Sequence, residues 1–246
     1  MLVLIDKKGR KHLVDEKIEE YHSNYGVLDL TNVKSGDVLE THLGHKFYCV
    51  KADLLDYYER LPRAGSIILK KDLGAIIANC GIGSGSRVVD AGTGTGATAI
   101  FLANIVGKEG KIYTYELRED HIKIARNNFE SAGLDDVVES KLGDVREGIE
   151  ESEIDAVIFD LPDPWLAVDK AYNALRIGGY VAVYNPYIEQ IRKAYIAMEE
   201  AGFKELRAIE LLERGFEIKE VGTRHRTRNI GHTAYLAFGR KYNQNI

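Results

Sequence analysis

The chain has 246 residues, of which 45% are hydrophobic and 29% are charged, and its formal net charge at pH 7 is −5. At ~100–200 residues per domain, this length predicts one large domain, or one of ordinary size with a small addition. The composition is close to the globular average, which argues against long disorder, a collagen-like fibre or a coiled-coil rod. The negative charge does not exclude nucleic acid as a partner, because binding depends on local patches.

The apolar segments are much shorter than the ~18 residues of a membrane-spanning helix. Charge begins soon after Met1, too early for a signal-peptide core, so we expect a cytoplasmic protein without a membrane contact. Cys49 and Cys80 have no CxxC spacing, and we expect two buried thiols. The histidines are scattered without metal-ligand spacing, so no metal site is predicted.

The first quarter of the chain is expected to form a small β-rich domain. Two apolar segments flank the turn residues Asp6–Arg10 and predict a hairpin. A helix-breaking segment at 61–65 marks the boundary, so we place the first domain at 1–62 and a larger one at 63–246. Further elements expected in the first domain are strands at 27–30, 37–42 and 46–51 and a helix at 52–60.

After Asp72, strands and helices alternate along the chain. This alternation predicts a doubly wound, mostly parallel sheet. Two strands at 203–214 and 233–241, joined by a polar loop, are expected to close the sheet as an antiparallel pair. The other expected strands are 86–92, 111–117, 137–142, 154–162 and 180–186, and the expected helices are 72–80, 96–107, 119–132, 166–176 and 187–201.

A glycine-rich loop follows the first strand of this second domain. The strand ends at Asp90, and Gly92, Gly94 and Gly96 precede the next helix. Glycine lets the backbone turn sharply and approach a ligand closely, and the helix start offers free N–H groups. A dinucleotide pyrophosphate and the aminocarboxypropyl end of S-adenosylmethionine both suit such a loop. The spacing Gly92-x-Gly94-x-x-Ala97 fits the loose dinucleotide fingerprint, so the loop alone does not separate the two.

Acidic residues stand at the ends of three strands, and two of them, Asp90 and Asp144, favour S-adenosylmethionine. A carboxylate at Asp90 can attract the cationic amino group of this cofactor, directly or through water. Glu116 ends the second strand and suits a ribose diol, which both cofactors contain. Asp144 follows the third strand, where an adenine amino group can bind.

The sequence Asp160-Leu161-Pro162-Asp163-Pro164-Trp165 follows the fourth strand, at the carboxyl edge where open α/β sheets bind ligands. Such residues resemble the pockets of base methyltransferases. A carboxylate accepts from an exocyclic amine there, and an aromatic ring stacks on the base. The alternative is a Pro-rich loop with Trp165 packed in the core.

Together these motifs resemble the tRNA adenine-N1 methyltransferase family of the TrmI type, over nearly the whole chain. The match runs in family order through ETHLGHKFYCVK (40–51), LPRAGSIILKKD (61–72), VVDAGTGTGATA (88–99), YELREDH (115–121), GDVREG (143–148), DLPDPW (160–165) and TRHRTRNIGHTAYLAFGRK (223–241). The resemblance implies an α/β class I methyltransferase: a Rossmann-like, seven-stranded mixed sheet with a small N-terminal β domain. It also implies a homotetramer that uses S-adenosylmethionine.

The substrate implied is tRNA, methylated at N1 of the T-loop adenine 58 and also at 57 in archaeal-like members. The resemblance makes Asp160 and Tyr184 the catalytic residues. Where many members have Tyr-Pro before the Lys-Asp of the entry segment, this chain has Leu69-Lys70, which leaves the stacking of the base open. The cofactor-binding residues are Asp90, Gly92, Gly94, Thr95, Gly96, Ala97, Glu116, His121, Asp144 and Asp160, and those expected to contact RNA are Trp165, Arg224, Arg226 and Arg228.

Other functions remain open at this stage. A class I methyltransferase with another acceptor, such as a protein isoaspartyl group or a small molecule, shares the glycine loop. A nicotinamide-dependent dehydrogenase also shares it, but leaves Asp90 and the Asp160–Trp165 segment unexplained. The three arginines could instead pair with acids of a neighbouring subunit.

Overall fold

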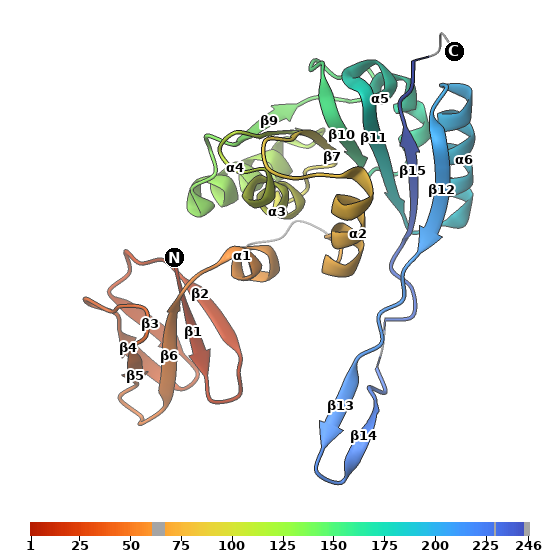
Figure 1. The fold of residues 1–246 in the computed structure, drawn as a ribbon. Coiled ribbons are helices and arrows are strands. Elements are labelled where there is room, and N and C mark those ends of the chain that lie inside the picture. Colours follow the sequence, from red (N-terminus) through yellow and green to blue (C-terminus); the bar gives the residue numbers. More distant parts are fainter. Residues whose placement is uncertain (61–66, 229, 244–246) are drawn as a thin grey trace.

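The computed structural model describes residues 1–60, 67–228 and 230–243. Figure 1 shows a small N-terminal unit, a larger α/β unit, and a hairpin that extends from the larger unit. The predicted domain boundary at 62–63 lies outside the described residues. None of the helices in the described part of the chain is long and apolar enough to cross a bilayer.

The N-terminal unit is built on a four-stranded antiparallel sheet in the order β2-β1-β6-β5. The predicted hairpin, β1 with β2, is present. The core of the unit contains the fully buried side chains of Leu4, Leu28 and Phe47. A second hairpin, β3 with β4, includes a strand that we did not predict, because its sequence EYHS is polar and half exposed. The strands are β1 Leu2–Asp6, β2 Lys11–Val14, β3 Glu20–Ser23, β4 Gly26–Asp29, β5 Val38–Glu40 and β6 Lys46–Lys51.

Helix α1 (Leu54–Arg60) connects this unit to the larger one. Its buried Asp56 accepts a hydrogen bond from Lys11 Nζ of β2 at 2.7 Å. On its other side, the ring of Tyr58 packs edge-on against Phe101, with centroids 5.4 Å apart. The helix expected at 52–60 is therefore present, and it contacts both units.

The larger unit contains a seven-stranded mixed sheet in the order β12-β15-β11-β10-β7-β8-β9. Six strands run in one direction, and β15 runs antiparallel to its neighbours β11 and β12, which confirms the predicted closing pair. The strands are β7 Arg87–Ala91, β8 Lys111–Glu116, β9 Val138–Leu142, β10 Ile154–Phe159, β11 Leu175–Asn185, β12 Lys204–Glu210 and β15 Tyr235–Arg240.

Helices cover both faces of the sheet (Figure 1). Successive side chains alternate between the faces: Val88 packs with α2, α3 and α4, whereas Val89 packs with α5 and α6. This is the predicted seven-stranded Rossmann-like fold. Both cysteines are free and buried, as expected. The helices are α2 Lys70–Cys80, α3 Ala97–Val106, α4 Glu119–Ala132, the 3-10 turn η1 Pro164–Leu166, α5 Val168–Ala174 and α6 Ile188–Glu200.

Two predictions about the last part of the chain are wrong. The helix expected at 166–176 ends at Ala174, because Leu175 already pairs with Ile154 and the strand continues through Gly178 and Gly179. The polar loop expected before the last strand contains a hairpin, β13 (Phe216–Lys219) with β14 (Gly222–His225). Its residues are exposed or half exposed, so no burial pattern indicated them.

Candidate active site

The carboxyl ends of the parallel strands surround a cavity of about 800 Å³. This volume lies within the ~300–1,000 Å³ range of small-molecule sites. Loops after four strands and the end of β11 contribute the wall. The lining residues are Ile67, Gly92, Gly94, Tyr115, Glu116, Leu117, Arg118, His121, Gly143, Asp144, Val145, Arg146, Asp160, Leu161, Pro162, Asp163, Tyr184, Pro186 and Thr233.

The glycine-rich loop brings bare backbone to the cavity. Gly92 has a φ of +103°, and a Cβ built on it would lie 2.3 Å from the carbonyl oxygen of Asp160. Gly96 has a φ of +82°, and its Cβ would lie 2.4 Å from the ring of Phe129. Gly92 and Gly94 line the cavity, whereas Thr95, Gly96 and Ala97 lie behind them, at the start of α3, and do not belong to the wall.

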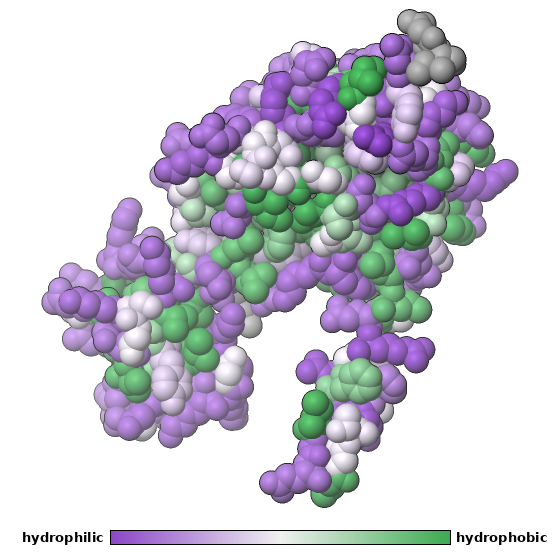
Figure 2. Space-filling view, in the orientation of Figure 1, coloured by the Kyte–Doolittle hydropathy of each residue, from purple (hydrophilic) through white to green (hydrophobic). Residues whose placement is uncertain are grey.

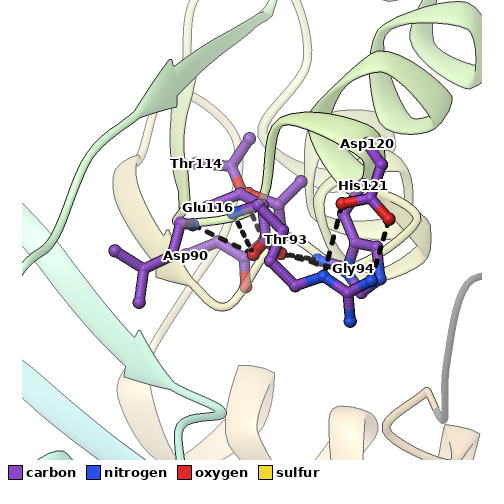
Figure 3. A network of polar contacts seen from close by, with 9 residues as sticks. Asp90, Thr93, Gly94, Thr114, Glu116, Asp120 and His121 are labelled. Carbon is purple, nitrogen blue, oxygen red and sulfur yellow. Dashed lines mark hydrogen bonds and ion pairs between the residues drawn. The ribbon is translucent and has the colours of Figure 1, made fainter.

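Glu116 closes one end of the glycine loop (Figure 3). Its Oε2 accepts the backbone N–H of Gly94 at 2.9 Å, and its Oε1 accepts those of Leu117 and Arg118 at 2.9 and 3.0 Å. His121 Nδ1 lies 3.6 Å from Oε2. A carboxylate has about four acceptor sites, so Glu116 keeps capacity for a ligand hydroxyl while its position is fixed.

Asp90 lies beneath the loop and is not part of the cavity wall (Figure 3). Its Oδ2 accepts a hydrogen bond from Thr114 Oγ1 at 2.8 Å, and Thr114 Oγ1 lies 2.6 Å from Thr93 Oγ1. Burial raises the pKa of Asp90 to about 7, and its Oδ1 has no partner among the described residues. In the structure Asp90 therefore braces the loop, and the attraction that we expected between it and the cofactor's amino group stays a prediction.

Asp144 has a partner that we did not predict. Arg146 donates to both carboxylate oxygens of Asp144, with Nε at 2.9 Å from each, and this holds the pKa of Asp144 below its usual range. The same guanidinium donates through Nη1 to Asp163 at 2.8 Å. Arg146 thus links the loop after β9 to the loop after β10 across the cavity. The only sequence signal was its place in GDVREG.

Asp160 is one of the carboxylates of the cavity wall and is half-buried. Burial raises its pKa to about 6, and among the described side chains none donates a hydrogen bond to its carboxylate. Its backbone N–H donates to the Ala91 carbonyl at 2.9 Å. Two amides that sequence reasoning missed hold its loop: Asn185 donates to the Leu161 carbonyl and Gln190 to that of Pro162, both at 2.6 Å. The loop of Asp160 is therefore held in place, and its carboxylate has no hydrogen-bond donor among the side chains that the structure describes.

Tyr184 faces the same cavity from the end of β11. Burial, with the charges of Asp72 and Asp160, raises the pKa of its hydroxyl to about 12, so the hydroxyl keeps its proton at neutral pH. Ile67 contributes to the wall, whereas Leu69, which stands where the family often has tyrosine, is not among the described residues of the wall. Leu69 therefore brings no side chain to the described wall, whereas Tyr184 brings an aromatic ring close to Asp160.

Trp165 does not line the cavity. It lies in η1, and Lys193 Nζ of α6 stands 4.6 Å from the centroid of its ring. Pro162 and Asp163 of the same segment do face the cavity, but the chain turns away after them. The expected stacking of Trp165 on a base is therefore not supported by its position.

The three arginines lie on or just after the hairpin of β13 and β14, which we call the arm. All three are exposed. Arg224 Nε donates to Glu217 of the opposite strand at 3.0 Å, whereas Arg226 and Arg228 have no ion pair among the described residues. Apolar side chains lie beside them on the arm (Figure 2), and Phe216, Ile218 and Val221 are exposed.

Comparisons with known proteins agree with this geometry. The family model described as "tRNA methyltransferase complex GCD14 subunit" matches residues 57–233. The chain belongs to this family. It is 38% identical to the Methanocaldococcus jannaschii protein named tRNA (adenine(57)-N(1)/adenine(58)-N(1))-methyltransferase TrmI, over 97% of this chain and 94% of the relative. It is 32% identical to the Thermus thermophilus tRNA (adenine(58)-N(1))-methyltransferase TrmI, over 98% and 96%.

Solved structures confirm the fold. A Thermotoga maritima structure described as a SAM-dependent O-methyltransferase superposes with a TM-score of 0.91 at 31% identity, and the match covers 100% of this chain and 94% of that one. The Aquifex aeolicus tRNA (m1A58) methyltransferase TrmI superposes at 0.81 with 24% identity, covering 99% and 97%. The class I methyltransferase fold and the resemblance to the TrmI type are both confirmed.

The residues present fit S-adenosylmethionine. Gly94 presents bare backbone, and Glu116 beside it keeps acceptor capacity for ribose hydroxyls. Asp144 and its neighbours form a polar end of the cavity, suited to an adenine amino group. S-adenosylmethionine is the methyl donor of this enzyme family. Among the described residues, no group of three or more His, Cys, Asp or Glu is placed to hold a metal ion.

Proposed function

We propose that this chain transfers a methyl group from S-adenosylmethionine to N1 of adenine 58 in the T loop of tRNA, and to adenine 57 as well. The position of Asp160, a fixed carboxylate without a partner on the described cavity wall, carries the proposal. The names of the Methanocaldococcus and Thermus relatives support it. The relative with higher identity carries both positions in its name, which favours 57 as a second acceptor. We place the reaction in the cytoplasm.

When bound, S-adenosylmethionine supplies a methyl group on a sulfonium, and adenine N1 attacks with its in-plane lone pair. The N1–C bond forms as the S–C bond breaks, and the adenine becomes cationic. Asp160 accepts a hydrogen bond from the N6 amino group, orients N1 and stabilises the developing charge. Tyr184 donates from its protonated hydroxyl or stacks against the base. Holding both partners in line contributes up to ~7–11 kcal/mol of the barrier reduction.

We assign the binding of the cofactor to the glycine-rich loop and to the ends of β8 and β9. Gly92, Gly94, Thr95, Gly96 and Ala97 shape the loop that receives the methionine end, with the last three acting through the backbone. Glu116 binds the ribose, His121 stands beside it, and Asp144 faces the adenine. Asp90 braces the loop through Thr114.

The tRNA must present its adenine outside the stack, because the cavity is closed on several sides by protein. Extruding a base costs a few kcal/mol, and stacking on an aromatic ring returns ~1–3 kcal/mol per base. Tyr184 lines the cavity, which supports this role for its ring. Arg226 and Arg228 on the arm suit phosphates, because guanidinium groups bind them as bidentate donors.

We also propose a homotetramer in which arms pack on other copies. The exposed Phe216, Ile218 and Val221 support this, because small soluble proteins rarely leave such clusters in water. Light scattering on the purified chain would measure the mass, and Ile218→Ser with Val221→Ser should lower it. A monomer for the unchanged chain would contradict the proposal.

The function is tested with an unmodified tRNA transcript. The chain is incubated with the transcript and S-adenosylmethionine, and digested nucleosides are analysed by mass spectrometry for N1-methyladenosine. Transcripts in which guanine replaces the adenine at position 57, at position 58 or at both locate the acceptors, and only the doubly changed transcript should stay unmodified. A 2′-O-methylated nucleoside, or no methylation, would overturn the proposal; the first would agree with the description of the Thermotoga structure as an O-methyltransferase.

A further inference from the structure

A buried ion pair lies in the first turn of α2, outside the residues assigned to catalysis. The side chain of Asp72 is 0% exposed and that of Lys71 is 13% exposed. Lys71 Nζ donates to Asp72 Oδ1 at 2.7 Å, to the Leu211 carbonyl at 2.8 Å and to Thr233 Oγ1 at 2.8 Å. An ammonium group has three protons, so all of its donors are used.

The same cluster reaches the part of the cavity wall that Tyr184, Pro186 and Thr233 form, which we call the acceptor side. Thr233 Oγ1 donates to the second oxygen of Asp72 at 2.8 Å, so both carboxylate oxygens have partners. Thr233 and Tyr184 line the cavity. The charge of Asp72 helps to raise the pKa of Tyr184, and a hydrogen bond with Thr233 opposes this rise. The ion pair therefore stands directly behind the wall that Tyr184 and Thr233 form.

The two other partners of Lys71 lie in the two segments that join the arm to the sheet, which we call its roots. Leu211 follows the end of β12 and Thr233 precedes β15, and the arm lies between them. Figure 1 shows the arm pointing away from the sheet from the ends of these strands. Within the described chain its strands β13 and β14 pair with each other and with no other strand. Within one chain, its orientation therefore depends on how its roots are held.

A second tie lies at the same roots. His232 Nδ1 lies 2.7 Å from Glu210, the last residue of β12, and its Nε2 lies 2.7 Å from the carbonyl of Pro186. Pro186 belongs to the cavity wall. Contacts from both roots thus converge on the acceptor side.

We propose that Lys71 is a positioning residue that fixes both roots of the arm against the acceptor side of the cavity, so that the arm and the cavity keep one relative orientation. This inference rests on the proposed function, because it makes the arm a guide for the RNA that enters the pocket. Lys71 is not among the described residues that line the cavity. It acts through Thr233 and the Leu211 carbonyl.

The test uses the full chain with Lys71→Met and Asp72→Asn combined, because removing Lys71 alone leaves a buried charge unpaired and destabilises the fold. The double variant loses both root contacts, while the amide oxygen that replaces a carboxylate oxygen of Asp72 can still accept from Thr233. Thr233→Val is the second variant; it keeps the ion pair and has nearly the same shape. Lys70→Met is the matched control, since Lys70 is an exposed neighbour that pairs with Glu59.

The orientation of the arm is measured first. Spin labels at Glu220→Cys, in the turn of the arm, and Glu109→Cys, after α3, report one distance by pulsed electron paramagnetic resonance, in samples diluted with unlabelled chain. Cys49 and Cys80 are buried and leave the labelling specific. We expect one narrow distance distribution for the unchanged protein and for Lys70→Met, and a broad one for the double variant and Thr233→Val. Equal widths would overturn the proposed role of Lys71.

Methyl transfer is measured next, in single turnover with tRNA and cofactor saturating. We expect the double variant to lose at least tenfold in rate while its affinity for S-adenosylmethionine stays within twofold. A broad distribution with an unchanged rate would overturn the coupling to the pocket. If the unchanged protein methylates no tRNA, the proposed function fails, and the distance measurement still decides whether Lys71 holds the arm.

Discussion

The carbonyl oxygen of Asp160 occupies the space that a side chain at Gly92 would need, 2.3 Å from the ideal Cβ position. The glycine loop and the loop after β10 therefore meet backbone to backbone. A further hydrogen bond, from Asp160 N to the Ala91 carbonyl at 2.9 Å, joins them. In the proposed function, this contact sets the distance between the methyl donor and the carboxylate that holds the base.

Gly92→Ala should separate these loops. Its φ of +103° already costs a residue with a side chain ~1–3 kcal/mol, and the clash with Asp160 adds to this. We expect a lower melting temperature and a loss of both cofactor affinity and methyl transfer, measured by calorimetry and single turnover. Gly148→Ala is the control, because nothing lies within 4 Å of its Cβ. Wild-type activity in Gly92→Ala would contradict the close approach of the two loops.

Asp160→Ala should reduce methyl transfer by ~10²–10³-fold, the scale for losing one preorganised contact to developing charge. Asp160→Asn still offers a carbonyl oxygen to the N6 amino group but no charge, so it should retain more activity. Single-turnover rates with saturating tRNA and cofactor separate chemistry from binding. If both variants lose only thermal stability and the folded fraction reacts at the normal rate, Asp160 is structural.

The raised pKa of Asp160 also predicts how stability depends on pH. Burial lifts this pKa to about 6 from an ordinary value near 4, so the folded state favours the protonated acid. Ionisation then costs stability as pH rises from about 4 to 6, and the cost persists above 6. Asp160→Asn should therefore be more stable than the unchanged protein at pH 8 and no more stable at pH 4. Thermal unfolding at both pH values, with tRNA absent, measures the difference.

Equal melting temperatures at pH 8 would show that Asp160 is better solvated than its position indicates. Asp90 titrates nearby, and the charge of Asp160 adds to the burial that raises its pKa to about 7. Asp160→Asn removes that charge, so the ionised Asp90 costs less stability in the variant, which acts in the same direction at pH 8.

The buried strands were predictable, and the exposed ones were not. Strands such as Ile154–Phe159 are apolar because helices cover both faces of the sheet, so their sequence carries the signal. The arm strands bury no side chain in this chain, and β3 buries only part of Tyr21 and Ser23. Burial against another copy or against RNA leaves no pattern of the kind that a single chain's core imposes.

Some residues of the candidate site were likewise predictable from the sequence, and others were not. Acids at strand ends were predictable, because parallel strands place their carboxyl ends at one edge. Arg146, Asn185 and Lys71 were not, since spacing does not show which partner each side chain meets: Lys71 and Thr233 lie 162 residues apart. Trp165 was predicted to face the base, but the 3-10 turn after Asp163 directs its ring toward α6. Spacing alone does not show the direction of a side chain.

Glu116→Ala should weaken cofactor binding. The variant loses the acceptor for ribose hydroxyls and also releases the Gly94 N–H that Glu116 fixes at 2.9 Å. Hydrogen bonds to a charged group contribute ~1.5–3 kcal/mol, so we expect affinity for S-adenosylmethionine to fall roughly tenfold or more. Calorimetric titration measures this. Glu119→Ala, an exposed residue paired with Lys123, is the control, and equal affinities for the two variants would remove Glu116 from the cofactor site.

The arm arginines should differ in their contribution to tRNA binding. Arg226 and Arg228 are exposed without an ion pair among the described residues. Each phosphate contact that a change to alanine removes should therefore lower the slope of log affinity against log salt by ~0.7–0.9. Arg224 is paired with Glu217 at 3.0 Å, so Arg224→Ala should lower it less.

Titrations of labelled tRNA at several salt concentrations measure these slopes, with Lys108→Ala as the control. Lys108 is an exposed cation in the loop after α3, at the opposite edge of the sheet from the cavity, so its slope should equal that of the unchanged chain. Light scattering on the same samples reads the mass of the assembly. Unchanged slopes with a smaller assembly would assign Arg226 and Arg228 to a contact between subunits. An arginine that faces a neighbouring chain contributes to association, but its removal does not change the number of counterions released when the protein binds RNA.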